Sequence, residues 1–116
     1  MKSFTSETKG DIIVIKISLK RATYKEAEEF KNFLLDTIND GLLKVILDFK
    51  DCEFIDSTFL STMVTGLKKV TSKNGNLKLA NIHSEVQLLL ELTGTAKVFE
   101  IYHSVRDAVR SYKVNA

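Results

Sequence analysis

The sequence predicts a single α/β domain built on a mixed β-sheet, and three observations support this fold class. A weak strand pattern and a strongly β-branched one flank a Gly-containing turn, which indicates an N-terminal strand hairpin. Apolar runs of strand length then alternate with segments whose apolar residues recur at helical spacing, as in sheets joined by right-handed crossovers. A chain of 116 residues also buries enough surface to fold as one unit, so we expect one domain over residues 1–116.

The first half of the chain is expected to form a hairpin, a helix and a third strand. The hairpin strands lie at residues 4–8 and 12–19. Thr23 and Glu26 have the spacing of a capping box, in which each side chain accepts the backbone N–H of the other residue, so a helix begins there. The helix ends before the apolar run at 44–49, which is the third strand.

The second half alternates helix and strand. A helix over about residues 58–72 precedes a short strand at 76–80. Residues 84–87 have the pattern of another capping box, which predicts a third helix. A last strand at 98–101 precedes a final helix that Ser104 caps. The expected order is β-β-α-β-α-β-α-β-α, with about four helices.

Composition argues against several classes of protein. The net charge is only +2, with acids and bases interleaved, so a dedicated nucleic-acid-binding surface is not expected. Cys52 is the single cysteine, which rules out an internal disulfide and is typical of a reducing compartment. The N-terminal residues lack the apolar core of a secretion signal, and no apolar run approaches the roughly 20 residues that span a bilayer. We therefore expect a cytoplasmic domain without membrane insertion.

Enzyme chemistry finds little support in the residues. The five glycines form no phosphate-binding loop, and His83 and His103 are isolated from the partners that catalysis or metal binding needs. A phosphorylated receiver domain would need paired carboxylates after an early strand, where this chain has residues 18–21, Ser-Leu-Lys-Arg. We expect no catalytic residue, metal or cofactor.

The most informative stretch is Asp56-Ser57-Thr58, which lies where a strand pattern gives way to a helix pattern. A Ser before an apolar helix is usually its N-cap and has no other role. An acid and two hydroxyls at an exposed corner are also typical of a functional loop. The residues alone leave both interpretations open.

Residues 56–60, Asp-Ser-Thr-Phe-Leu, resemble the Asp-Ser-Ser/Thr-Gly-Leu signature of the STAS domain, the fold of bacterial anti-sigma factor antagonists. The order of elements is similar along nearly the whole chain. The resemblance implies that Ser57 accepts phosphate and that Asp56, Thr58, Phe59 and Thr23 belong to a partner-binding surface. It also implies partner switching. The unphosphorylated domain binds an anti-sigma factor that is itself a serine kinase, phosphorylation ends the binding, and a serine phosphatase reverses it.

Two places depart from the family pattern. Phe59 stands where the family usually has Gly, and it either widens the buried face of the helix or offers a partner a partly exposed ring. Lys20 and Thr23 stand where the family often has Gly and Asp. Thr23 keeps the capping role of that Asp but lacks its carboxylate, so the resemblance does not carry over the kinase-partner contacts usually assigned to that carboxylate.

Two alternatives from other classes share this fold. One is a scaffold subunit of a larger signalling complex, in which Ser57 is phosphorylated without a sigma factor nearby. The other is an accessory domain of a lipid or small-molecule transport system. We favour the antagonist; a neighbouring gene for a kinase-like anti-sigma factor would support it over the scaffold, whereas stoichiometric capture of transporter subunits would support the transport domain.

Overall fold

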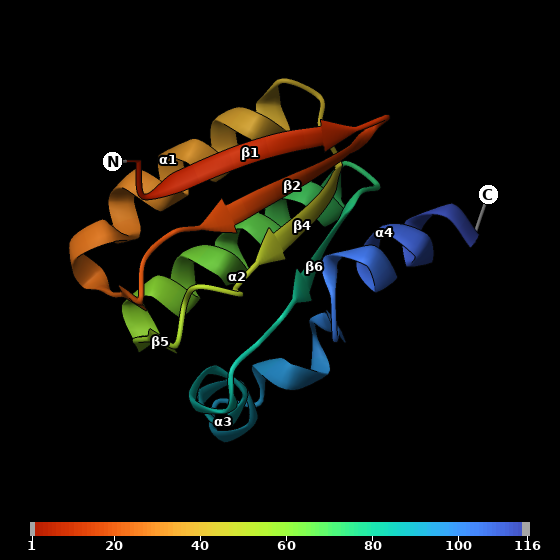
Figure 1. Cartoon of the computed structure of the whole chain (residues 1–116). Helices are drawn as coiled ribbons and strands as arrows, with labels where there is room; N and C mark the ends of the chain where they lie inside the picture. The colour runs from red at the N-terminus through yellow and green to blue at the C-terminus, as the bar shows by residue number, and fades with distance from the viewer. Residues whose placement is uncertain (1, 115–116) are drawn as a thin grey trace.

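The computed structural model describes residues 2–114 and has the expected mixed α/β architecture (Figure 1). The strands are β1 (Phe4–Lys9), β2 (Ile12–Ile17), β3 (Arg21–Ala22), β4 (Lys44–Asp48), β5 (Phe54–Ile55), β6 (Asn76–Ala80) and β7 (Glu100–Tyr102). The helices are α1 (Tyr24–Asn39), α2 (Ser57–Ser72), α3 (Ser84–Leu92) and α4 (Val105–Val114), with a short 3₁₀ turn, η1 (Thr95–Lys97), before β7. The predicted fold class is confirmed.

The main sheet has the strand order β1-β2-β4-β6-β7. Strands β1 and β2 are antiparallel, as a hairpin requires, and the pairs β2–β4, β4–β6 and β6–β7 are parallel. Helices α1 and α2 cover one face and α4 covers the other (Figure 1). The carboxyl ends of the parallel strands therefore lie at one edge, where the connections to the helices form an exposed surface.

The larger apolar core lies between the sheet and the pair α1–α2. It includes Ile15 and Leu47 from the sheet and Phe30 and Met63 from the helices, all fully buried. Gly66 lets the two helices approach closely, because a Cβ at this position would clash with the side chain of Leu34 on α1. At this point α2 therefore packs closely against α1.

Two local expectations need correction, and one feature of the fold was not predicted. The capping box expected at Ser84 is wrong, because the N-cap of α3 is His83 and its ring instead places Nε2 2.7 Å from the carbonyl oxygen of Lys50. The last strand begins two residues later than predicted, since the 3₁₀ turn leaves Val98 exposed before the chain joins the sheet. Strands β3 and β5, of two residues each, pair with each other and were not predicted.

Candidate functional site

The short parallel pair β3–β5 brings the starts of α1 and α2 to one corner. Arg21 pairs with Phe54, and Ala22 pairs with Ile55. The pairing continues beyond the strands, where the backbone N–H of Asp56 donates to the carbonyl oxygen of Ala22 at 3.3 Å. Each helix begins within two residues of its strand. Two helix N-termini, with their unpaired N–H groups and positive dipole ends, therefore meet at this corner.

The carboxylate of Asp56 caps α2 and reaches across to α1. Its Oδ1 accepts the backbone N–H of Phe59 at 2.8 Å, and its Oδ2 accepts the backbone N–H of Tyr24 at 2.8 Å. The expectation that Ser57 is the N-cap is therefore wrong. Asp56 has the extended backbone of a cap, whereas Ser57 is already the first residue of the helix.

Ser57, the predicted phosphate acceptor, and Thr58, a predicted partner-binding residue, are both exposed at the start of α2. The first N–H groups of a helix have no acceptor within it. The Asp56 carboxylate binds that of Phe59, the third helical residue, and leaves those of Ser57 and Thr58 to other acceptors. The hydroxyl of Ser57 thus lies beside the positive end of a helix dipole and is open to solvent. Such a position accommodates an added anion.

Thr23 closes the corner from the α1 side, and the predicted capping box is confirmed. Its Oγ1 accepts the N–H of Lys25 at 3.3 Å, while Glu26 Oε1 accepts the N–H of Thr23 at 2.9 Å. Thr23 is half-buried. Glu26 and Asp56 together provide carboxylates to the α1 terminus, although Thr23 itself has none.

Phe59 does not lie on the surface of this site. Its side chain is fully buried, and its ring stacks on that of Phe30 with centroids 4.6 Å apart, while the Phe4 ring lies 6.3 Å away. The expectation that Phe59 offers a partner a partly exposed ring is wrong. Where the family pattern has Gly, this chain places an aromatic side chain in the core between α1, α2 and β1.

The exposed aromatic residue of the corner is Tyr24, which sequence reasoning missed. Its side chain is 65% exposed, and it is the first residue of α1 as Ser57 is of α2. Nearby, the guanidinium of Arg21 lies 4.1 Å from the centre of the Phe54 ring, in a cation–π contact. The exposure of Tyr24 could have been predicted from its position directly after the capping Thr23, before the buried face of the helix begins.

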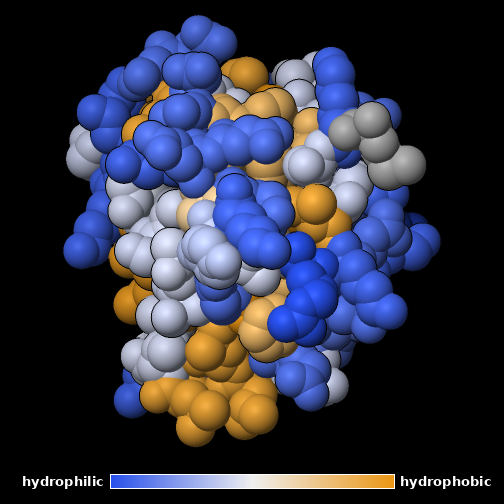
Figure 2. Space-filling model, turned by 90° about the vertical axis from the view of Figure 1, so that its left-hand side faces the viewer, coloured by the Kyte–Doolittle hydropathy of each residue, from blue (hydrophilic) through white to orange (hydrophobic). Residues whose placement is uncertain are grey.

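Figure 2 shows this end of the molecule, where the starts of α1 and α2 lie. Polar and neutral side chains cover most of the view, and an apolar patch lies at the bottom, where Figure 1 places α3. Leu88 and Leu92 are the large exposed apolar side chains of α3. No group of three or more His, Cys, Asp or Glu side chains in residues 2–114 has the arrangement of a metal site.

Cys52 lies in the loop between β4 and β5 but is fully buried. Its Sγ lies 3.5 Å from the carbonyl oxygen of Phe54. Burial raises the pKa of the Cys52 thiol to about 11, so the thiol is neutral at physiological pH. Its role is packing beneath the corner.

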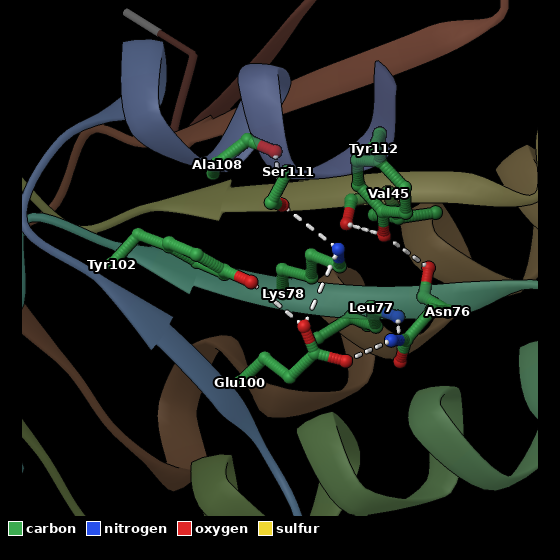
Figure 3. A network of polar contacts seen from close by, with 9 residues as sticks. All are labelled: Val45, Asn76, Leu77, Lys78, Glu100, Tyr102, Ala108, Ser111 and Tyr112. Carbon is green, nitrogen blue, oxygen red and sulfur yellow. Dashed lines mark hydrogen bonds and ion pairs between the residues drawn. The ribbon is translucent and has the colours of Figure 1, made fainter. Parts of the chain in front are cut away.

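A second polar cluster lies between the sheet and α4 (Figure 3). The side chain of Lys78 is only 5% exposed, and its Nζ contacts Ser111 Oγ at 2.8 Å and Glu100 Oε1 at 3.3 Å. The same Nζ lies 4.0 Å from the centre of the Tyr112 ring. The ammonium group of this lysine therefore has polar and aromatic partners, as a buried cation requires.

The hydroxyl of Tyr112 joins α4 to the two central strands. It lies 2.8 Å from the carbonyl oxygens of Val45 on β4 and Asn76 on β6, which share its single proton (Figure 3). Burial raises the pKa of Tyr112, so the phenol keeps its proton. The cluster holds α4 on the sheet and lies near the start of β6, whereas Ser57 lies beyond the carboxyl end of β4.

Comparison with known proteins agrees with the fold. The STAS domain family model matches residues 3–108. A Thermotoga maritima protein with the provisional name of anti-sigma factor antagonist is 30% identical over 104 residues, which are 89% of this chain and 92% of that protein. A crystal structure of a Thermotoga maritima protein with the same provisional name superposes with a TM-score of 0.85 at 26% identity, covering 93% of this chain and 92% of the other.

The Bacillus cell fate determinant SpoIIAA in its phosphorylated form has a TM-score of 0.75 at 15% identity, over 94% of this chain and 98% of that one. That likeness shows the fold alone. The family model spans most of the residues, including the corner at Asp56 and the strands that build it. The chain therefore belongs to the STAS domain family, and its relatives there bear the name of anti-sigma factor antagonists.

None of the helices described between residues 2 and 114 is long and apolar enough to cross a membrane.

Proposed function

We propose that this protein is an anti-sigma factor antagonist that acts by partner switching, with Ser57 as the phosphorylated residue. One observation carries the proposal: the Ser57 hydroxyl is exposed at a helix start whose geometry is fixed by Asp56 rather than by Ser57 itself. Ser57 is therefore free to be modified without loss of the cap. The names of the relatives, and the existence of a phosphorylated SpoIIAA with this fold, support the same function.

In the proposed cycle, the unphosphorylated domain binds an anti-sigma factor that is also a serine kinase. The kinase transfers the γ-phosphoryl group of ATP to Ser57 Oγ, the hydroxyl proton leaves to the kinase's base, and ADP departs. A separate phosphatase hydrolyses the ester and restores the hydroxyl. The domain itself is the substrate and the binding module in this cycle.

The phosphate acts by charge at a preformed surface. It adds about −1.5 to −2 charges at neutral pH. The N–H groups of Ser57 and Thr58 and the dipole of α2 receive part of that charge, so the fold tolerates it. Asp56 and the exposed Glu53 are close to Ser57 in the sequence. Burying three anionic groups against a partner is unfavourable through repulsion and desolvation, which ends the interaction.

The test begins with affinity capture from the native cell, with and without ATP, to isolate a bound serine kinase. That kinase is then purified and incubated with the full chain and ATP, and peptide mapping by mass spectrometry locates the phosphate. A single phosphate on Ser57, absent from Ser57→Ala and retained in Thr58→Ala, supports the proposal. Modification of Thr58 in the wild-type chain, or binding that is unchanged after Ser57 is modified, contradicts it.

A further inference from the structure

Tyr24 is an exposed aromatic residue at the start of α1, the helix that begins beside Ser57. The parallel register places Ala22 beside Ile55, and the chain continues on each side into a capping residue and then the first helical residue. The backbone N–H of Tyr24 donates to the side chain of Asp56 at 2.8 Å, and Asp56 directly precedes Ser57. Tyr24 and Ser57 therefore occupy equivalent positions on neighbouring helices, both facing solvent.

The fold does not explain why residue 24 is aromatic. Its link to Asp56 is made by the backbone N–H, which nearly any residue supplies. The buried face of α1 begins at Ala27 and continues through Phe30 and Leu34, and the Tyr24 ring has no part in it. A side chain that is 65% exposed contributes little to folding.

Exposed tyrosines contribute strongly when they bind a partner. Their rigid ring buries a large area with little loss of conformational freedom, and the phenol adds one hydrogen bond. Beside it, Arg21 stacks on the Phe54 ring with its guanidinium 4.1 Å from the ring centre. The stack places a positive group on β3, three residues before the start of α1.

We propose that Tyr24 is a principal contact of the kinase that phosphorylates Ser57. This inference rests on the function proposed above and names a residue that the family signature does not include. The ring enters an apolar slot on the kinase that carries a hydrogen-bond acceptor for the phenol. By holding the first turn of α1, the kinase also holds Asp56 and so fixes the adjacent Ser57 hydroxyl at its active site.

The test uses the full chain, ATP and the purified kinase that modifies wild-type Ser57. Tyr24→Ala is expected to lower kcat/KM for Ser57 phosphorylation about tenfold or more, mainly by raising KM. Tyr24→Phe keeps the ring and should stay within about threefold of wild type. Val98→Ala is the matched control, because Val98 is 56% exposed and lies beside Lys68 and Thr71 at the other end of α2.

Two further measurements separate recognition from folding. Thermal unfolding of each variant should match wild type, because the backbone link to Asp56 survives truncation of an exposed side chain. A photoreactive benzoylphenylalanine at position 24 should crosslink to the kinase, and the same group at position 98 should not.

The outcomes distinguish this inference from the function on which it rests. If the kinase modifies wild-type Ser57 and Tyr24→Ala keeps a kcat/KM within twofold of it, the Tyr24 contact is refuted while the function stands. Crosslinking at position 98 but not at 24 refutes it as well and moves the contact toward the opposite end of α2. If no kinase modifies wild-type Ser57, the function fails and the inference with it.

Discussion

The side chain of Asp56 accepts the backbone N–H of Tyr24 at 2.8 Å, so one carboxylate joins the first turns of two helices that are 32 residues apart in sequence. The same carboxylate caps its own helix through Phe59. The corner that carries Ser57 is therefore held by a polar side chain at its centre and by the β3–β5 pair beneath it. Each of the following predictions follows from this arrangement or from the packing around it.

Replacement of Asp56 should destabilise the protein more than loss of an ordinary cap. An N-cap substitution typically costs about 0.5–2 kcal/mol, and Asp56→Ala also leaves the Tyr24 N–H without its partner. We expect a loss of about 2 kcal/mol or more by urea unfolding. Thr23→Ala, which removes a cap from α1 alone, should cost about 1 kcal/mol. Equal losses in the two variants would show that the link to Tyr24 adds nothing.

Ser57→Ala should leave stability almost unchanged, within about 0.5 kcal/mol, because Ser57 is an exposed first residue and not the cap. The variant should still bind the unmodified protein's partner, while Ser57→Asp should fold normally and bind more weakly. Unfolding midpoints and binding titrations measure both effects. A stability loss near 1 kcal/mol in Ser57→Ala would instead show that the Ser57 hydroxyl caps the helix.

Phosphorylation of Ser57 should change the structure only locally. The helix start already presents N–H groups to an anion, and no buried group has to move to admit one. Amide NMR spectra of the two forms should differ mainly over residues 54–63 and at the neighbouring start of α1. Shifts that extend along α1 to Ile38 and through α4 would instead indicate a global rearrangement, against the electrostatic mechanism.

Phe59→Ala should destabilise the protein by about 3–5 kcal/mol, because it removes a fully buried ring from the contact with Phe30. Any loss of partner affinity should disappear once the measured fraction of folded protein is taken into account. Chemical unfolding and binding titrations on the same samples provide that correction. A residual loss of affinity in fully folded protein would restore a recognition role for this position.

Glu100 should stabilise α4 in a pH-dependent way. A hydrogen bond from the Tyr102 phenol, together with the Lys78 ammonium, lowers the pKa of Glu100 in the folded protein. Because the folded pKa is lowered, the stabilisation is complete above the ordinary value of about 4.3 and is lost as pH falls through the folded value. Glu100→Gln should thus be less stable than wild type at pH 7, with the difference shrinking in acid.

A suitable control is Glu28→Gln, which removes one charge from an exposed position of α1. Its unfolding midpoint should follow that of wild type across the same pH range. A constant difference between Glu100→Gln and wild type at all pH values would mean that the carboxylate charge has no part in holding Lys78.

Local signals were sufficient for most of the fold. The capping box at Thr23 and Glu26 and the helical spacing after it depend on residues close in sequence, and both are seen in the structure. The β-branched strand at residues 12–17 and the hairpin were predictable for the same reason. The pair β3–β5 was not, because strands of two residues have no periodic pattern and their pairing joins segments about 33 residues apart.

The errors at the site have the same origin. Asp56 and Ser57 are both good N-caps, and a preference for either cannot be read from neighbouring residues. The second hydrogen bond of Asp56, to a residue far away in sequence, belongs to the tertiary structure. Phe59 lies at the margin of the apolar stripe on α2, and it is buried in contact with the rings of Phe30 and Phe4, which belong to other elements. The exposure of Tyr24 likewise depends on tertiary structure, because no other element within residues 2–114 covers its ring.

Because Asp56 accepts a hydrogen bond from the start of α1, the position of Ser57 depends on two separate segments of the chain. A peptide of residues 54–63 contains the whole signature but lacks the β3 partner and the Tyr24 N–H that orient it. Grafting that signature onto another α/β scaffold would transfer the sequence but not the conformation of the site. A designer who wants a portable phosphorylation switch from this protein has to carry residues 21–24 along with it, in parallel register.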